Sequence, residues 1–307
     1  MAIMSGRSHQ GRLPPLTAEE ALLRDRLRGH VQVLSEQIGE RNTGQFRSLG
    51  EAAAYLKTAF GAQGLTVREE PYRVEAKEVV NIEAQIRGSD LPGEIVVIGA
   101  HYDSVFGSPG ANDNASGVAA LLELARTLRD AKPRRTIRLV AFVNEEPPYF
   151  LSESMGSLVY ARRARERREQ IVAMLSIETI GYYSDRPKSQ QYPASLSRFY
   201  PDTGNFIGFV SDLGSLNLLR RVLGSFRKST QFPSEGVAAP GNIPGIGWSD
   251  HWSFWQAGYR AIMITDTAPF RYPHYHDSSD TPDKLDYDRM ARVVGGIVKV
   301  VGDLANQ

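Results

Sequence analysis

The sequence predicts an α/β fold of three layers, in which helices cover both faces of a largely parallel, mixed β-sheet. Two observations support this prediction. The segments 94–104, 136–146 and 171–183 begin as continuous apolar runs, which is typical of strands buried on both faces. Amphipathic segments with helical spacing, 116–130 and 154–168, separate these runs. Buried strands that alternate with helices favour a parallel sheet.

The segments before this alternating region predict two helices and two strands. A first helix is expected to begin at Thr17, because "TAEE" forms a capping box with Glu20 three residues after the N-cap. A second helix is expected from about 48 to 64. The stretch 65–84 combines β-branched residues with polar alternation, and it predicts two strands at an edge of the sheet.

The rest of the chain is expected to supply two more strands and two more helices, separated by loops rich in glycine, proline and polar residues. In chain order these are loop 184–205, strand 205–211, helix 215–228, loop 231–249, strand 260–267 and helix 286–304. The sequence contains no internal repeat and no low-complexity linker. We therefore expect a flexible N-terminal tail, 1–16, followed by a single domain, 17–307.

Composition excludes several classes of function. The chain has 307 residues, of which 41% are hydrophobic, and its formal net charge is +1. This balance gives no broad electrostatic case for binding nucleic acid or an anionic membrane. The absence of cysteine excludes disulfides, thiolate metal ligands and a cysteine nucleophile.

The first 17 residues contain no apolar stretch long enough for a signal peptide or a membrane span. A native targeting segment can still be missing from this chain. A periplasmic, secreted or cytoplasmic location therefore stays open at this stage, as does the oligomeric state.

Acidic and histidine side chains follow several of the predicted strands. Ligands of open parallel sheets bind at the carboxyl ends of the strands, so these side chains are expected at one edge. In chain order they are His101 and Asp103, Asp113 in "GANDNASG", Glu145 and Glu146, Glu178, and then His274, His276 and Asp280. Taken singly, each has a structural explanation, such as a solvated strand end for the glutamate pair or an N-cap for Asp113. Only their shared location argues for a site.

So many carboxylates at one edge would repel each other unless a cation compensated them, and mixed histidine and carboxylate ligands suit zinc. The charges of two zinc ions balance three carboxylates, those of Asp113, Glu146 and Glu178, together with one hydroxide. Glu145 would then stay uncoordinated and take a proton from the water that the metals activate. The sequence also allows manganese or cobalt in place of zinc.

Five motifs in this order resemble the co-catalytic di-zinc aminopeptidases of the bacterial leucyl-aminopeptidase and glutaminyl-cyclase type. The motifs are "GAHYDS", "GANDNASG", "AFVNEE", "SIETIG" and "YHDSSDTPDKLD", and the resemblance spans roughly residues 90–300. It implies the zinc exopeptidase fold and a peptide substrate. It also implies a cis peptide bond between Asp113 and Asn114.

The resemblance also implies a role for each site residue. The implied zinc ligands are His101, Asp113 as the bridging carboxylate, Glu146, Glu178 and His276. Asp103 is implied to orient His101, and Glu145 to act as the general base. The segment "SDHWSF" resembles a family segment near the site, where Asp250 would orient a ligand or contact substrate. His274 is expected to neighbour His276 and to line the pocket.

One departure from the family pattern concerns the pocket. The loop "PPYFLSESM" intervenes between the paired glutamates and Gly156, and we expect it to reshape the pocket. Tyr182, Tyr183 and the aromatic segment "SFW" are candidates for a hydrophobic pocket that takes the first substrate residue, although core packing is the commoner role of such aromatics.

These observations favour a zinc-dependent exopeptidase that removes the N-terminal residue of a peptide. The alternatives are a single-zinc glutaminyl cyclase and a non-catalytic binding domain on the same fold. A structural calcium protein is disfavoured, because calcium seldom takes imidazole ligands. Carboxypeptidase and deacylase activities use the same metal pair, so they stay open.

Overall fold

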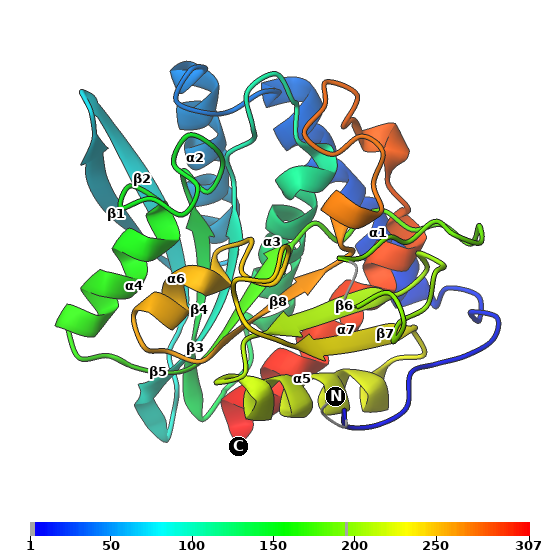
Figure 1. Cartoon of the computed structure of the whole chain (residues 1–307). Helices are drawn as coiled ribbons and strands as arrows, with labels where there is room; N and C mark the ends of the chain where they lie inside the picture. Colours follow the sequence, from blue (N-terminus) through cyan, green and yellow to red (C-terminus); the bar gives the residue numbers. More distant parts are fainter. Residues whose placement is uncertain (1–3, 194–195) are drawn as a thin grey trace.

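The computed structural model describes residues 4–193 and 196–307, and its strands form one mixed sheet of eight (Figure 1). Across the sheet the strand order is β1-β2-β4-β3-β5-β8-β6-β7. The strands are β1 (Thr66–Val74), β2 (Lys77–Ile86), β3 (Leu91–His101), β4 (Arg135–Phe142), β5 (Gln170–Glu178), β6 (Ile207–Ser211), β7 (Ser234–Ala238) and β8 (Ala261–Thr265).

The centre of the sheet is parallel and its flanks are mixed, as the sequence predicts. Strand β3 pairs in parallel with β4 and β5, and β5 pairs in parallel with β8. On one flank β2 runs antiparallel to β4, and β1 antiparallel to β2. On the other flank β6 runs antiparallel to β8 and parallel to β7. The carboxyl ends of β3, β4, β5 and β8 therefore point to the same edge.

Helices cover both faces of the sheet, and each face has its own apolar core. The helices are α1 (Ala18–Gln32), α2 (Phe46–Gly61), α3 (Gly117–Leu128), α4 (Gly156–Glu166), α5 (Leu216–Ser229), α6 (His251–Gln256) and α7 (Tyr287–Asn306). The larger core contains Val96 and Ile98 of β3 together with residues of α1, α2, α3, α5 and α7. Ile95 and Val97 point to the other face and pack with residues of α4 and α6. The sheet is thus the middle of three layers.

Shorter helical turns complete the chain, and two segments differ from the sequence-based expectation. The turns are Val33–Ile38, Ala111–Ser116, Ala268–Phe270 and Pro282–Lys284. The expected loop 231–249 contains strand β7, whose five residues "SEGVA" carry only one β-branched side chain, so that local preference does not reveal it. Helix α6 begins within the "SDHWSF" segment and is too short for a periodic signal.

The expected N-terminal tail runs along α5 and β7. Residues 4–16 form neither helix nor strand. The Ser234 backbone N–H donates to Ser8 Oγ at 2.9 Å, and the Arg227 guanidinium donates to the carbonyls of Ser5 and Gly6. Residues 1–3 of the expected tail and 194–195 of the expected loop 184–205 lie outside the described residues. The flexibility of the tail and the division into tail and single domain stay predictions.

Within the described ranges, no helix has both the length and the apolar character that crossing a membrane requires.

Helix α1 begins as the capping box predicts. The Glu20 backbone N–H donates to Thr17 Oγ1 at 3.1 Å, and the Thr17 backbone N–H donates to Glu20 Oε2 at 2.8 Å. Two N–H groups that the helix leaves free are thereby satisfied.

We expect Thr17→Ala to lower the free energy of unfolding by about 1 kcal/mol, because it removes the hydroxyl that caps the helix. Thr17→Ser keeps this hydroxyl and is expected to match the wild type. Urea denaturation followed by circular dichroism measures both variants. An equal decrease in the free energy of unfolding of Thr17→Ala and Thr17→Ser would mean that the Thr17 hydroxyl does not stabilise the helix.

Candidate active site

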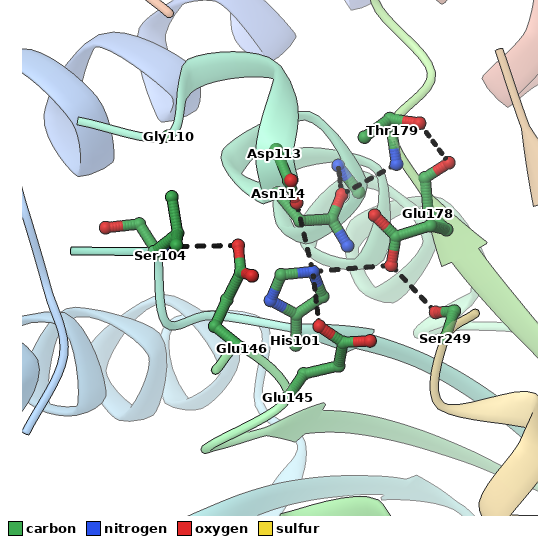
Figure 2. A network of polar contacts seen from close by, with 12 residues as sticks. His101, Ser104, Gly110, Asp113, Asn114, Glu145, Glu146, Glu178, Thr179 and Ser249 are labelled. Atoms are coloured by element: carbon green, nitrogen blue, oxygen red, sulfur yellow. Dashed lines mark hydrogen bonds and ion pairs between the residues drawn. The ribbon is translucent and has the colours of Figure 1, made fainter. Parts of the chain in front are cut away.

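The acidic and histidine side chains meet where the central strands end (Figure 2). His101 is the last residue of β3, and Glu178 is the last residue of β5. Glu145 and Glu146 follow β4 after two residues, and Asp113 lies in the turn Ala111–Ser116 before α3. All five side chains are buried or nearly so. The sheet therefore brings together residues that are up to 77 positions apart, from His101 to Glu178.

Three of these residues form a first group of possible metal ligands, namely His101, Asp113 and Glu178. Their ligand atoms all lie within 4.8 Å of one another. His101 Nε2 is 3.3 Å from Asp113 Oδ1 and 3.3 Å from Glu178 Oε2. The same oxygen of Glu178 also accepts a hydrogen bond from Ser249, whose hydroxyl donates to Glu178 Oε2 at 2.7 Å.

A second group contains Asp113, Glu146 and His276, again with ligand atoms within 4.8 Å of one another. His276 Nε2 is 3.2 Å from Asp113 Oδ2 and 3.2 Å from Glu146 Oε2. Asp113 thus directs one carboxylate oxygen to each histidine. Asp113 could therefore contribute one oxygen to each group, as the bridging role implied by the resemblance would require.

The donor set fits zinc. His101 Nε2 is buried and has no hydrogen-bond partner among the described residues, although carboxylate oxygens surround it. Such an orphaned nitrogen is costly unless another group uses its lone pair. Each group offers one imidazole nitrogen and two carboxylates, and this mixture suits zinc better than calcium. His101, Asp113 and Glu178 would hold one ion, and Asp113, Glu146 and His276 another.

The electrostatics of the protein alone reflect this crowding. Burial raises the pKa of Glu146 to about 7, with a further contribution from the nearby Asp113. Burial lowers the pKa of His276, but hydrogen bonds to Asp113 and Glu146 outweigh it and raise the pKa to about 10. Burial likewise opposes the charge of His101, yet Glu178 and Glu145 hold its pKa well above the ordinary value. Positive charge is strongly favoured at this edge.

Glu145 belongs to neither ligand group. Its Oε2 is 3.8 Å from His101 Nε2, and burial raises its pKa well above that of an ordinary glutamate. Asp103 fixes the backbone of the glutamate pair, because its two oxygens accept the N–H groups of Glu145 and Glu146 at 3.2 and 3.1 Å. Asp103 Oδ1 is also 3.6 Å from His101 Nδ1, on the ring edge away from the ligands. An orienting role for Asp103 is consistent with both contacts.

Two asparagines attach the turn of Asp113 to the sheet, although sequence analysis assigned them no role. Asn114 Oδ1 accepts the N–H of Thr179, just after Glu178, and its Nδ2 donates to the carbonyl of Ile177. Asn112 Oδ1 accepts the N–H of Gly181. The peptide bond between Asp113 and Asn114 is cis, as the resemblance implies. The two asparagines in the motif "GANDNASG" were a signal of this supporting role, since a side-chain amide can accept from one backbone group and donate to another.

Arg41 is a second supporting residue that sequence analysis missed. Its side chain is fully buried, and it donates to the carbonyls of Tyr102, Pro109 and Gly110 at 2.7, 2.5 and 2.8 Å. Arg41 thereby joins the segment after β3 to the segment before Asp113. Its position in the polar stretch "ERNTGQ", 60 residues before His101, gives no local signal of this role.

The remaining candidate residues lie at different distances from the centre. Asp250 is fully buried, neither of its carboxylate oxygens has a hydrogen-bond partner among the described residues, and its charge acts on Glu145. His274 Nδ1 instead contacts Ser279 Oγ at 2.6 Å, and Tyr182 packs its ring on Tyr272 with centroids 4.9 Å apart. Neither His274 nor Tyr182 lines the cavity beside the metal-ligand groups.

A cavity of about 370 Å³ opens beside Asp113, Glu145, Glu146, Glu178 and His276. Its walls are mostly apolar and come from four loop regions, 145–150, 190–206, 244–248 and 267–276, and from strands β6, β7 and β8. Its aromatic residues are Phe150, Tyr192, Tyr200, Phe206, Phe209, Trp248, Phe270 and Tyr275. Phe150 and Pro147 belong to the loop "PPYFLSESM", which contributes to the pocket as expected.

The pocket prediction for Tyr182, Tyr183 and "SFW" is not met. Tyr183 packs on Phe232 within the larger core, and Phe254 lies in the core under α4 and α6. Phe254 and Trp255 of α6 pack against the apolar core on this face of the sheet, so they contribute to packing. Apart from Phe209 of β6, the aromatic residues that do line the cavity lie in loops and short turns, where sequence periodicity carries no information about direction.

Comparison with known proteins places the chain in a family. The chain belongs to peptidase family M28, whose profile matches residues 81–301. It is 39% identical over 286 residues to the uncharacterized protein YfbL of Escherichia coli, covering 90% of this chain and 87% of YfbL.

Two solved structures share the fold. The zinc aminopeptidase BSAP of Bacillus subtilis superposes with a TM-score of 0.71 and 15% identity, covering 92% of this chain and 95% of BSAP. The glutaminyl cyclase of Fimbriiglobus ruber superposes with a TM-score of 0.68 and 18% identity, covering 96% and 97% of the two chains. One fold therefore carries two different activities, and the site must distinguish them.

Asp280 holds the turn that carries Asp113, which yields a prediction. Its Oδ1 accepts the N–H of Asn112 at 2.8 Å and its Oδ2 the N–H of Asp113 at 3.1 Å. We expect Asp280→Ala to lower the free energy of unfolding by about 2–4 kcal/mol, because two buried donors lose their acceptor. Zinc affinity is expected to fall as well.

Tyr272→Phe is the matched control for Asp280→Ala. It removes only the hydroxyl that donates to Asp280 Oδ1 at 2.7 Å, and it leaves both backbone donors paired. Its cost is expected to be about 1 kcal/mol. Urea denaturation and zinc titration measure both variants. A similar loss in both would refute the role of Asp280 as the acceptor for this turn.

Proposed function

We propose that this protein is a zinc-dependent aminopeptidase that hydrolyses the N-terminal peptide bond of its substrates. The observation that carries the proposal is the pair of complete ligand groups that share Asp113, with Glu145 beside them and outside both. Membership of peptidase family M28 supports a hydrolase of peptide bonds. The adjoining cavity supports a site that takes one side chain at a time.

The proposed metal content is two zinc ions per chain. When bound, they would supply an acidified water and polarise the carbonyl of the scissile bond. The protein's part is to hold the ligands in place. Asp103 orients His101 through its outer nitrogen, and Ser249 holds the carboxylate of Glu178. Asn114 and Asp280 fix the turn of Asp113, so that both of its oxygens stay directed to the two histidines.

Glu145 is the proposed general base. Its carboxylate lies 3.8 Å from His101 Nε2 and belongs to neither ligand group, so it would be free to accept and return a proton. It would take a proton from the attacking water and later give that proton to the leaving amine. Because its backbone N–H is bound to Asp103, its position is set independently of substrate.

A glutaminyl cyclase is the competing function, because the cyclase of Fimbriiglobus ruber has the same fold. The sequence-based expectation for a cyclase is a single zinc site. Both histidines and all three ligand carboxylates are grouped here, which favours the hydrolase. Cyclisation of a peptide with N-terminal glutamine, without hydrolysis of aminoacyl anilides, would favour the cyclase instead.

The two-zinc proposal predicts metal content. Wild type is expected to bind two zinc ions per chain by mass spectrometry of the metal. His276→Ala is expected to bind about one, because it leaves His101, Asp113 and Glu178 intact. His274→Ala is the matched control, two residues away and outside both groups, and should keep two. A single zinc in wild type, or no difference between the two variants, would contradict the proposal.

The role of Glu145 predicts a separation between metal binding and catalysis. Glu145→Gln is expected to lower kcat on aminoacyl anilides by at least about 100-fold, because it removes the proton acceptor. Zinc content should stay at the wild-type value, since Glu145 is in neither ligand group. Glu153→Gln, in the exposed part of the following loop, controls for the loss of a nearby negative charge. Full activity of Glu145→Gln would eliminate it as the base.

A further inference from the structure

One carboxylate in the cavity belongs to neither the ligand groups nor the proposed catalytic residues. Glu235 of β7 lines the same cavity as Asp113 and Glu145. It is partly buried, and burial raises its pKa above the ordinary value, whereas the charge of Arg227 lowers it. No hydrogen bond or ion pair joins its carboxylate to the residues that the structure describes. An acidic group without a partner in an apolar cavity is a candidate for binding a cation.

The register of the sheet places Glu235 opposite the metal-ligand end of the cavity. Glu178 of β5 pairs with Thr265 of β8, Thr265 pairs with Gly208 of β6, and Gly208 pairs with Glu235. Paired residues of neighbouring strands point to the same face of a sheet. These four residues therefore form one row on the cavity face, and all four line the cavity.

This row sets the length of the cavity floor. Three strand spacings separate the backbones of Glu178 and Glu235 by roughly 14 Å. Between them the row contains Thr265 and Gly208, and the side chain of Thr267 lies beside Gly208. At Gly208 an added Cβ would lie 3.2 Å from the carbonyl oxygen of Thr265 and 3.3 Å from Thr267 Cγ2, so a side chain larger than that of glycine would be crowded here. The floor thus runs from a metal ligand at one end to a carboxylate at the other.

Arg227, whose charge acts on Glu235, directs its guanidinium hydrogen bonds to other groups. Arg227 Nε donates to Ser234 Oγ at 3.0 Å, and its Nη2 donates to the Ser234 carbonyl at 2.6 Å. Its Nη1 donates to the carbonyls of Ser5 and Gly6 at 3.2 and 3.1 Å. The charge of Arg227 lowers the pKa of Glu235, but among the described contacts the guanidinium forms no ion pair with Glu235 within 4.0 Å. The carboxylate keeps its lone pairs for a ligand.

Two tyrosines at this end of the cavity also favour a cation. Tyr192 donates its hydroxyl hydrogen to the carbonyl of Pro201 at 2.6 Å, and Tyr200 donates to the carbonyl of Gly236 at 2.9 Å. Each phenol oxygen then has only acceptor capacity left. Burial, with the charge of Glu235, raises the pKa of Tyr200 to about 12. Ring faces, acceptor oxygens and a carboxylate together suit an ammonium or guanidinium group.

We propose that the cavity takes the side chain of the first substrate residue and that Glu235 binds its terminal positive charge, which makes peptides with N-terminal lysine or arginine the preferred substrate class. This inference rests on the proposed aminopeptidase function. The apolar walls would contact the methylene stem. An extended lysine or arginine side chain spans roughly 6–7 Å at ordinary bond lengths. With a contact of about 3 Å at each end, the total of about 12–13 Å is slightly shorter than the roughly 14 Å between the two strand backbones, so the side chain fits along the floor.

The test compares substrates that differ only in the terminal charge. Norleucine has the aliphatic chain of lysine without its ammonium group. We expect wild type to hydrolyse lysyl and arginyl anilides with kcat/KM at least about tenfold above the norleucyl anilide. In Glu235→Gln, which keeps the shape and removes the charge, the ratio of lysyl to norleucyl kcat/KM is expected to fall at least about tenfold. Glu235→Asp keeps the charge and should keep a preference for lysine.

Glu69→Gln is the matched control, because Glu69 is an exposed glutamate on β1, the opposite edge strand, and its ratio should equal that of wild type. A wild-type preference for norleucine, or an unchanged ratio in Glu235→Gln, would overturn the inference while leaving the aminopeptidase in place. If wild type hydrolysed no anilide, the proposed function would fail. Calorimetric titration with lysinamide and norleucinamide would then test the inference by itself. The inference requires that wild type bind lysinamide more tightly than norleucinamide and that Glu235→Gln lose this difference in affinity.

Discussion

The burial of several carboxylates around two histidines is the constraint on which the rest of the site depends. Asp113, Glu146 and Glu178 stand close enough to His101 and His276 that their charges cannot be treated separately. Such a group is unfavourable in an apolar interior unless positive charge compensates it. Within the protein the histidines are held toward their charged forms. Zinc would replace these protons when it binds, which links metal affinity to pH.

The surrounding structure can be understood as a scaffold that keeps this group from moving apart. Arg41 links the segment that follows His101 to the segment that precedes Asp113. Its positive charge also interacts with the carboxylates of Asp113 and Glu146. Asn114 joins the turn of Asp113 to the end of β5. Asp103 belongs to neither ligand group and accepts backbone N–H groups of the glutamate pair. These contacts use backbone groups, so their strength does not depend on substrate.

The same sheet builds both the metal-ligand groups and the cavity, but from different strands. Three of the five candidate ligands, His101, Glu146 and Glu178, lie at or just after the ends of β3, β4 and β5, whereas β6, β7 and β8 form most of the cavity floor. Chemistry and side-chain selection are therefore separable in this fold. Under the proposed role of Glu235, a change on β7 would alter the preferred substrate without removing any of the candidate ligands. The same fold occurs in a zinc aminopeptidase and in a glutaminyl cyclase.

Sequence by itself determined the central sheet, the capped first helix and the shared sheet edge of the acidic and histidine residues, because each depends on a local pattern. Continuous apolar runs predict buried strands, and side chains after such strands share an edge. Tertiary structure alone decided which side chains line the cavity and which ones support the ligands. Arg41, Asn112 and Glu235 act through residues distant in the chain, and no periodicity records such contacts. Tyr183 and Phe254 are aromatic residues of the kind that often line apolar pockets, but in this structure both pack into the apolar cores.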